Sequence, residues 1–169
     1  MLLDSHGLVV EDSWRFEKST ADLRGSGDIL VSWEFWCKNR GILIRRSIDG
    51  TGRTGVSVSV DIPFDEVAAD SRSLALIALE FEKFTDGRFF SWANRLRRIC
   101  EFEGELRAVG DIHRDQLPQL RRVGFNSFSL DNQSRSHVIQ LPTNPFSLVY
   151  QCAPDGATSV REKRLADKG

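Results

Sequence analysis

The sequence contains few cysteines, and their spacing excludes several kinds of site. Only three occur in 169 residues, at Cys37, Cys100 and Cys152, and no C-x-x-C motif is present. A zinc ribbon or a thioredoxin-type redox site is therefore not expected. Each cysteine lies in apolar sequence, which predicts buried, reduced thiols in a cytoplasmic protein.

Long apolar runs are also missing. The longest one, LALIAL at 74–79, is far shorter than the about 20 residues that a membrane helix needs. The first residues, MLLDSHGLVVED, have neither the basic start nor the apolar stretch of a signal peptide. We therefore expect no contact with a membrane, and no glycosylation of the sequon at Asn132.

The chain carries no excess of either charge sign. Its 23 Lys and Arg residues and 24 Asp and Glu residues give a net charge of -1, so no partner made of nucleic acid is expected. Apolar residues make up 40% and charged residues 28%, which is typical of a globular protein. A chain of this length buries roughly 70% of its unfolded surface and needs no metal or disulfide to hold a core.

Short predicted elements alternate in the first half. Residues 1–27 are expected to form an extended segment, in which GLVVED (7–12) is a candidate short strand. A helix predicted at 33–40 separates predicted strands at 28–32 and 41–46. The motif G-x-G-x-x-G occurs at 50–55, but a dinucleotide site requires a helix after it. VSVSVDIP follows instead and predicts a strand, which favours a surface turn over a nucleotide cradle.

The second half is more regular, with strands and helices in alternation. Strands are predicted at 74–81, 105–111, 125–130 and 146–152, and helices at 87–101 and 111–122. Pro118 is compatible with the second helix if it begins late, with Arg114 or Asp115 as its cap, or if it begins at Asp111 and kinks.

This alternation predicts βαβ units and the α/β fold class. A full eight-stranded barrel typically needs about 250 residues. We therefore expect a single α/β domain over residues 1–152, best defined at 74–130, with a mainly parallel open sheet and helices on both faces. Residues 153–169 are polar and aperiodic, and are expected to form a flexible tail.

Functional loops of such a sheet lie at the carboxyl ends of its strands. The loops after the strands at 74–81 and 105–111 would meet at one edge, which we call the rim. The candidate ligand- or partner-binding residues are Thr85, Asp86, Gly87, Arg88, Ser91, Arg95, Arg107, Gly110, Asp111, Arg114, Asp115 and Gln116. We expect Arg88 and Arg107 to lie near both loops, with Asp86 as the partner of Arg107.

Arginine dominates the basic residues of this region. Eight arginines and no lysine lie between residues 86 and 125. The guanidinium fork suits oxyanions and carboxylates, and helix N-termini add backbone N–H donors. Sulfite, sulfate, phosphate or an acidic protein surface would fit such a rim. The alternative is that these arginines pair with the six acidic residues of the same stretch on solvated helix faces.

Three residues of the rim are candidates for catalysis. Asp86 and Asp111 are most simply helix N-caps, and alternatively act as acid/base groups or hold Mg²⁺. His113 is either a general base or a surface residue. No nucleophile elbow, P-loop or zinc motif is present, so no cofactor and no metal are predicted, and whether the chain is an enzyme stays open.

Two stretches, LALIALEFEKFTDGRFFSWANRLRR and GELRAVGDIHRDQLPQLRRVGFNSFSL, resemble a bacterial domain-of-unknown-function family linked to sulfite reduction. The likeness covers residues 74–130, and more weakly 9–14 and 149–151. Members of the family typically lie beside genes for sulfite reductase and phosphoadenylylsulfate reductase. The resemblance implies an accessory or interaction protein of assimilatory sulfite and sulfate reduction that assists sulfite reductase. The alternative is a small enzyme that acts on an anionic sulfur or phosphate compound at the rim.

The chain departs from the family pattern at several positions. Phe89, Phe90 and Trp92 stand where the family has Gly-Tyr and a glutamine. Pro118 and the residue after it stand where aromatic residues are usual. Val123 replaces a cysteine, which excludes a thiol role at that position.

Overall fold

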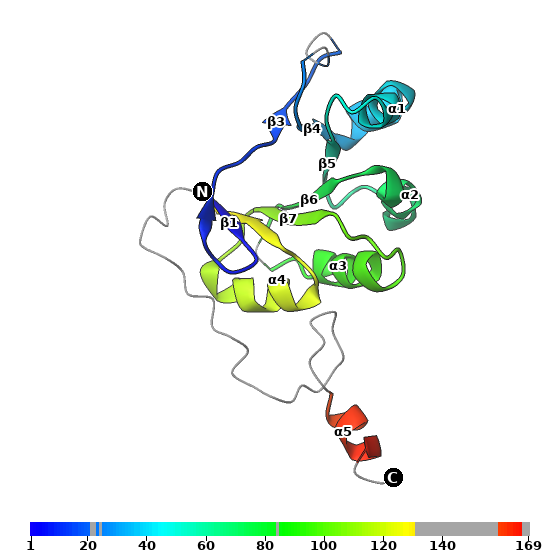
Figure 1. The fold of residues 1–169 in the computed structure, drawn as a ribbon. Coiled ribbons are helices and arrows are strands. Elements are labelled where there is room, and N and C mark those ends of the chain that lie inside the picture. Colours follow the sequence, from blue (N-terminus) through cyan, green and yellow to red (C-terminus); the bar gives the residue numbers. More distant parts are fainter. Residues whose placement is uncertain (21–22, 24, 84, 131–158, 167–169) are drawn as a thin grey trace.

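The computed structural model of the chain describes residues 1–20, 23, 25–83, 85–130 and 159–166 (Figure 1). Its strands are β1 (Leu2–Asp4), β2 (Val9–Val10), β3 (Arg15–Phe16), β4 (Ile29–Ser32), β5 (Thr54–Val58), β6 (Leu76–Phe81), β7 (Glu105–Gly110) and β8 (Ser127–Ser129). Its helices are α1 (Trp33–Ile48), α2 (Phe64–Asp70), α3 (Arg88–Arg98), α4 (Leu117–Val123) and α5 (Val160–Ala166), with 3-10 turns η2 (Ser71–Ser73) and η3 (Arg114–Gln116).

The eight strands form one mixed sheet in the order β2-β1-β8-β7-β6-β5-β4-β3. From β3 to β8 each strand is parallel to its neighbours. β1 is antiparallel to both β8 and β2. The α/β class is thus confirmed, whereas the prediction of a mainly parallel sheet is wrong. The short strand expected within GLVVED is present as β2, whereas β1 and the antiparallel pairing of the N-terminal segment with β8 were not predicted.

The prediction that helices cover both faces of the sheet is also wrong. β4 to β8 follow one another in chain order without a reversal, and right-handed crossovers in one direction place their helices on one side. Figure 1 accordingly shows α1, α2, α3 and α4 in succession round the outside of the sheet. On this outer face Ile77, Leu79 and Phe81 of β6 share the main core with Phe89 and Leu96 of α3.

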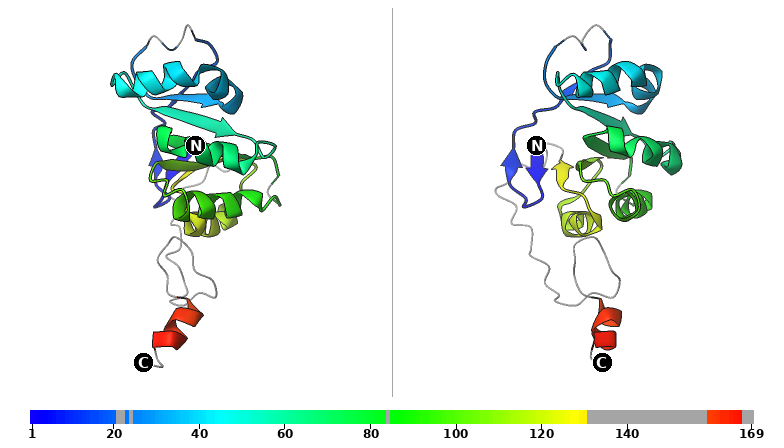
Figure 2. Two further views of the ribbon diagram at one scale, coloured as in Figure 1. Left: turned by 90° about the vertical axis from the view of Figure 1, so that its right-hand side faces the viewer. Right: turned by 45° about the vertical axis from the view of Figure 1, so that its right-hand side comes forward.

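The sheet curls strongly, and the length of one connection explains why. β2 and β3 form its two edges, and residues 11–14 join them. The chain from Val10 to Arg15 reaches at most about 18 Å, whereas the edges of a flat sheet of eight strands would lie about 34 Å apart. The edges must therefore approach each other, and Figure 2 shows the resulting curved arrangement from two further sides.

The inner face of the sheet is the side away from the helices. Leu76 and Ala78 of β6 lie there, alternating with the residues that point to the outer core, and Trp14 packs on them. Trp14 belongs to the connection between β2 and β3, so this short N-terminal segment covers the inner face.

Several local predictions from the first half need correction. Residues 41–46 are not a strand but continue α1, in which Asn39 is non-helical. α2 was not expected. The turn at 50–55 is confirmed, since it leads from α1 into β5 rather than into a helix. Cys37 is exposed, contrary to the expected burial, and Cys100 is partly buried; both are free thiols.

In the second half, α4 begins late. This is one of the two alternatives that would make the helix compatible with Pro118. Pro118 lies in its first turn and η3 precedes it, while Gln116, not Arg114 or Asp115, is the N-cap. Gly124 ends α4 with a φ of 119°. α5 lies within the segment expected to be a flexible tail. The strand predicted at 146–152, Cys152 and the domain boundary lie outside the described residues.

Candidate functional site

The two rim loops lie side by side. Phe81 pairs with Gly110 at the ends of β6 and β7, and the backbone N–H of Asp111 donates a hydrogen bond of 2.8 Å to the Phe81 carbonyl oxygen. Gly110 has a φ of +96°, and a Cβ there would collide with the same carbonyl oxygen. The glycine therefore lets the chain turn sharply at this edge.

Asp86 and Arg88 form a local ion pair on the first loop. The Arg88 Nη2 lies 2.6 Å from the Asp86 carboxylate, which also accepts a 3.0 Å hydrogen bond from the Arg88 backbone N–H. Arg88 lowers the pKa of the Asp86 carboxyl through these hydrogen bonds. The Arg88 side chain is 61% exposed. Asp86 is not the N-cap that was predicted, because Gly87 holds that position.

Asp111 and His113 lie together on the second loop. The His113 Nε2 is 3.5 Å from the Asp111 carboxylate. The Gln116 side-chain oxygen accepts a 3.0 Å hydrogen bond from the His113 backbone N–H, which fixes the start of η3. Asp111 is not a helix N-cap either, since His113 precedes η3. Arg114 and Asp115 lie within η3.

The other candidates on α3 and its leading loop have distinct surroundings. Thr85, Gly87 and Ser91 are exposed. The Arg95 guanidinium lies 3.6 Å from the centre of the Phe64 ring and 3.4 Å from the Asp65 carboxylate. Arg95 therefore joins α3 to α2.

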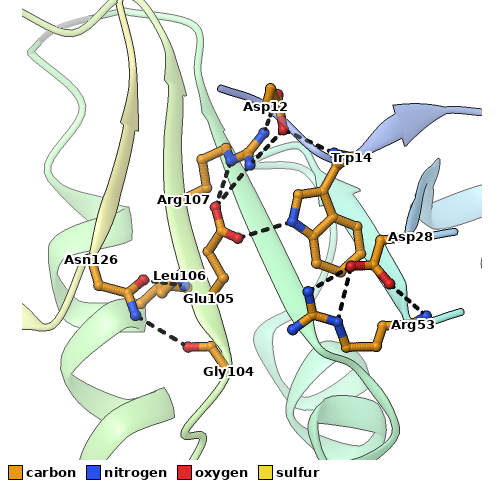
Figure 3. A network of polar contacts seen from close by, with 9 residues as sticks. All are labelled: Asp12, Trp14, Asp28, Arg53, Gly104, Glu105, Leu106, Arg107 and Asn126. Atoms are coloured by element: carbon orange, nitrogen blue, oxygen red, sulfur yellow. Dashed lines mark hydrogen bonds and ion pairs between the residues drawn. The ribbon is translucent and has the colours of Figure 1, made fainter. Parts of the chain in front are cut away.

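Arg107 does not lie at the rim. It is 3% exposed, on the inner face of β7, and its partners are Asp12 and Glu105 rather than the predicted Asp86 (Figure 3). Its two terminal nitrogens donate to the Asp12 carboxylate at 2.8 and 3.0 Å, and its Nε donates to Glu105 at 2.9 Å. A salt bridge of this depth holds the N-terminal segment on the sheet.

The same network extends to Trp14 and Arg53 (Figure 3). The Trp14 indole N–H donates a 3.0 Å hydrogen bond to the second Glu105 oxygen. The Arg53 guanidinium lies 5.3 Å from the centre of the Trp14 ring and pairs with Asp28 at 2.5 Å. One feature of the sequence indicates this network. Side chains alternate between the two faces of a strand, so the strand at 105–110 places Glu105 and Arg107 on the same face.

A second inner-face contact lies nearer the rim. The Ser57 hydroxyl of β5 donates a short hydrogen bond to the Glu80 carboxylate of β6. Sequence reasoning missed both residues, since a lone serine and a lone glutamate in strands match no motif.

Arg97 shows how far the arginine-rich stretch serves the fold. It donates to the carbonyl oxygens of Phe102, Gly104 and Gly124, and burial lowers the pKa of its guanidinium. Arg95, Arg97 and Arg107 thus have intramolecular partners, but of these partners only Glu105 is an acidic residue of the same stretch.

The positions that depart from the family pattern are packing positions. The Phe89 ring meets the Phe81 ring edge-on at 5.2 Å, and Trp92 meets Phe64 in the same way at 5.2 Å. Val123 packs against the main core. The bulky residues therefore fill the space between α3, α2 and the sheet.

Two cavities in the described part of the chain lie away from the rim. One of about 470 Å³ opens between the N-terminal segment and the starts of β5 to β8, with Asp12, Arg53 and Arg107 in its lining. Another, of about 650 Å³, lies beside α1. Within the described residues no cluster of His, Cys, Asp or Glu is arranged to hold a metal, and none of the described helices is long and apolar enough to cross a bilayer.

Comparison with known proteins identifies the family. The profile of the family described as "Bacterial protein of unknown function (DUF934)" matches residues 55–161, which include β6, α3, β7 and both rim loops. The chain belongs to the DUF934 family. Searches of curated proteins and of solved structures gave no significant match. The DUF934 match takes in the rim but leaves out β4 and α1, which precede residue 55.

Proposed function

We propose that the chain is a cytoplasmic accessory protein of assimilatory sulfite and sulfate reduction. It contacts sulfite reductase, or another protein of that pathway, through the rim and needs no cofactor of its own. The pathway rests on the family resemblance, and the rim as contact surface rests on its geometry.

The observation that carries the proposal is the exposed pairing of charges on two adjacent loops. Asp86 pairs with Arg88 on the first loop, and Asp111 lies 3.5 Å from the His113 imidazole on the second, so two carboxylates and a guanidinium lie on these adjacent loops. A small ligand is normally enclosed in a pocket by converging groups, whereas charges of both signs on an open edge fit the polar rim of a protein interface.

Co-purification tests this proposal. Tagged chain is isolated under mild conditions from native cells grown on sulfate, and sulfite reductase subunits are quantified by mass spectrometry. We expect sulfite reductase or another sulfur-assimilation protein to be enriched over a tagged unrelated control. Absence of every such protein would contradict the proposal.

A second candidate is a small enzyme that acts on an anionic sulfur or phosphate compound. The observation that favours it is the 3.5 Å approach of His113 to Asp111 on a loop that begins beside the first rim loop. Thermal unfolding with sulfite, sulfate, thiosulfate, adenylyl sulfate and nucleotides separates the candidates, because a ligand at 100 times its dissociation constant adds about 2.7 kcal/mol of stability. A shift that is lost in His113→Gln would favour the enzyme.

A further inference from the structure

The second half of α1 presents an exposed face that the main core does not use. Lys38, Ile42, Arg45 and Asp49 recur at helical spacing and are all exposed, as is Gly41 beside them. They border the cavity of about 650 Å³ beside α1, with Thr51 of the following turn at its end. We call this feature the α1 groove.

One aliphatic side chain lies open to water on this face. Ile42 is 57% exposed, although Leu43, the next residue of the same helix, is fully buried. An apolar side chain of a partner would remove this surface from water, which is the main favourable contribution to most protein contacts.

The groove is also positively charged. Lys38 and Arg45 are exposed, and neither forms an ion pair within the described part of the chain. Arg46 lies beneath them at 5% exposure. It donates to the carbonyl oxygens of Gly25 and Gly27, while its Nε has no hydrogen-bond partner among the described residues. These cations outnumber the carboxylate of Asp49, so the charge of the groove is complementary to an acidic occupant.

The backbone of α1 is unusual at the groove. Gly41 lies inside the helix, where glycine is unfavourable, and a Cβ at this position would meet no atom within 4 Å. Internal packing therefore gives no reason for the glycine, which lets another backbone approach closely. Asn39, two residues earlier in the helix, breaks the helical geometry with φ -122° and ψ 16°.

From these observations we infer that the α1 groove binds an acidic peptide segment of a partner protein. An aliphatic or aromatic side chain of that segment packs on Ile42, and its carboxylates face Lys38 and Arg45. The last turn of α1 leads into the start of β5, whereas the rim lies at the ends of β6 and β7. The α1 groove therefore lies toward the opposite end of the strands from the rim, and this inference does not depend on the function proposed above.

Selection from a library of short random peptides displayed on phage tests the inference. The full chain is the target, and the charge-reversed variant Lys38→Glu/Arg45→Glu is used for counter-selection. We expect the enriched peptides to be acidic and to carry at least one large apolar side chain. A fluorescein-labelled copy of an enriched peptide then gives dissociation constants by fluorescence anisotropy.

Matched variants make the measurement specific. Binding should weaken by about tenfold or more in Lys38→Glu/Arg45→Glu and in Ile42→Ser. Arg98→Glu/Arg121→Glu makes the same change in net charge at exposed arginines of α3 and α4, and should leave the affinity within about twofold. If the reversed variant fails to fold by circular dichroism, Lys38→Gln/Arg45→Gln replaces it.

Three outcomes would overturn the inference. One is a selection in which no peptide depends on the groove, or in which the groove-dependent peptides are basic or neutral. Another is an equal loss of affinity in the control at Arg98 and Arg121. The third is displacement of the peptide by sodium sulfate at submillimolar concentration and constant ionic strength, which would identify a site for small anions instead.

Discussion

Arg107 ties the N-terminal segment to β7 through one guanidinium group. Its position in a strand two residues from Val109 predicted that its guanidinium either finds a carboxylate partner or reaches the surface. The identity of that partner was not predictable, because Asp12 lies 95 positions away in the chain. Only the curl of the sheet brings the two residues together.

We predict that Arg107→Ala lowers the free energy of unfolding by about 3 kcal/mol, because it leaves Glu105 and Asp12 without their shared cation. This is the lower end of the range for a broken buried pair, since Asp12 keeps contact with water. Urea unfolding followed by tryptophan fluorescence measures the change. A loss below about 1 kcal/mol would show that water replaces the guanidinium without penalty.

The Asp28–Arg53 pair predicts a specific acid sensitivity. Hydrogen bonds from Arg53 hold the pKa of the Asp28 carboxyl below its ordinary value of 3.8. The unfolded chain therefore takes up a proton at Asp28 before the folded chain does, so this contribution to stability is complete above pH 3.8 and is lost as pH falls through the folded pKa.

The stability of Asp28→Asn should accordingly fall below that of the wild type at pH 5, and the difference should shrink as the pH drops below 3.8. Urea unfolding at a series of pH values gives this difference. Asp115→Asn, which removes an exposed carboxylate elsewhere, is the control. A difference that stays constant down to the lowest pH would contradict the assignment.

At the scale of single elements, α1 shows where local sequence reasoning fails. Residues 41–46 combine isoleucine and leucine in a short run, which favours a strand. In the fold, the buried residues Trp36, Leu43 and Arg46 of α1 recur at intervals of seven and three, which is the spacing of one helix face and not of a strand. By contrast, β6, α3 and β7 were predicted well, because their apolar patterns have a single consistent period.

Gly41→Ala should stabilise the protein by about 0.5 to 1 kcal/mol, since alanine lowers the entropy of the unfolded chain and its Cβ meets nothing in the fold. For a chain of this size we expect the midpoint of thermal unfolding to rise by about 2 to 4 °C. Gly110→Ala is the contrasting variant and should lower the midpoint, because its φ is +96° and its Cβ would strike the Phe81 carbonyl. A decrease in Gly41→Ala would mean that the helix needs the glycine itself.

The rim loops also show which features of single elements can and cannot be predicted from the sequence. Their adjacency followed from the order of predicted strands and is confirmed by the pairing of Phe81 with Gly110. The helix caps were not predictable, because Asp86 and Asp111 are each used in local ion pairs instead. Aspartate before a helix is compatible with either role.

For the molecule as a whole, the curl of the sheet depends on residues 11–14. These residues join the two edges and carry Trp14, which fills the inner face between Leu76, Ala78 and the Arg53 guanidinium. No sequence pattern marks a segment of this kind, since its contacts come from distant strands. The sheet is open, with β2 and β3 as its edges, but it curls, and its helices lie on one face because β4 to β8 follow one another without a reversal.

We predict that Trp14→Ala lowers the free energy of unfolding by about 3 kcal/mol or more, as expected for truncation of a buried aromatic side chain. Phe16→Ala, which removes an aromatic side chain that is 49% exposed, should cost about 1 kcal/mol or less. Chemical denaturation monitored by circular dichroism compares the two. Equal losses would mean that Trp14 does not hold the inner face.

The central claim is that the rim serves recognition rather than folding, and Arg88 tests it most directly. Arg88 lies in the first turn of α3, where a cation opposes the helix dipole, and it is largely exposed. The measurement is growth on sulfate as sole sulfur source, with cysteine as the permissive control, for strains that carry Arg88→Ala or Arg98→Ala in place of the wild type. We expect Arg88→Ala to grow slowly on sulfate only, with a thermal midpoint within a few degrees of the wild type, and Arg98→Ala to grow normally. Unfolding of Arg88→Ala, or growth of both strains at the wild-type rate on sulfate, would contradict the account.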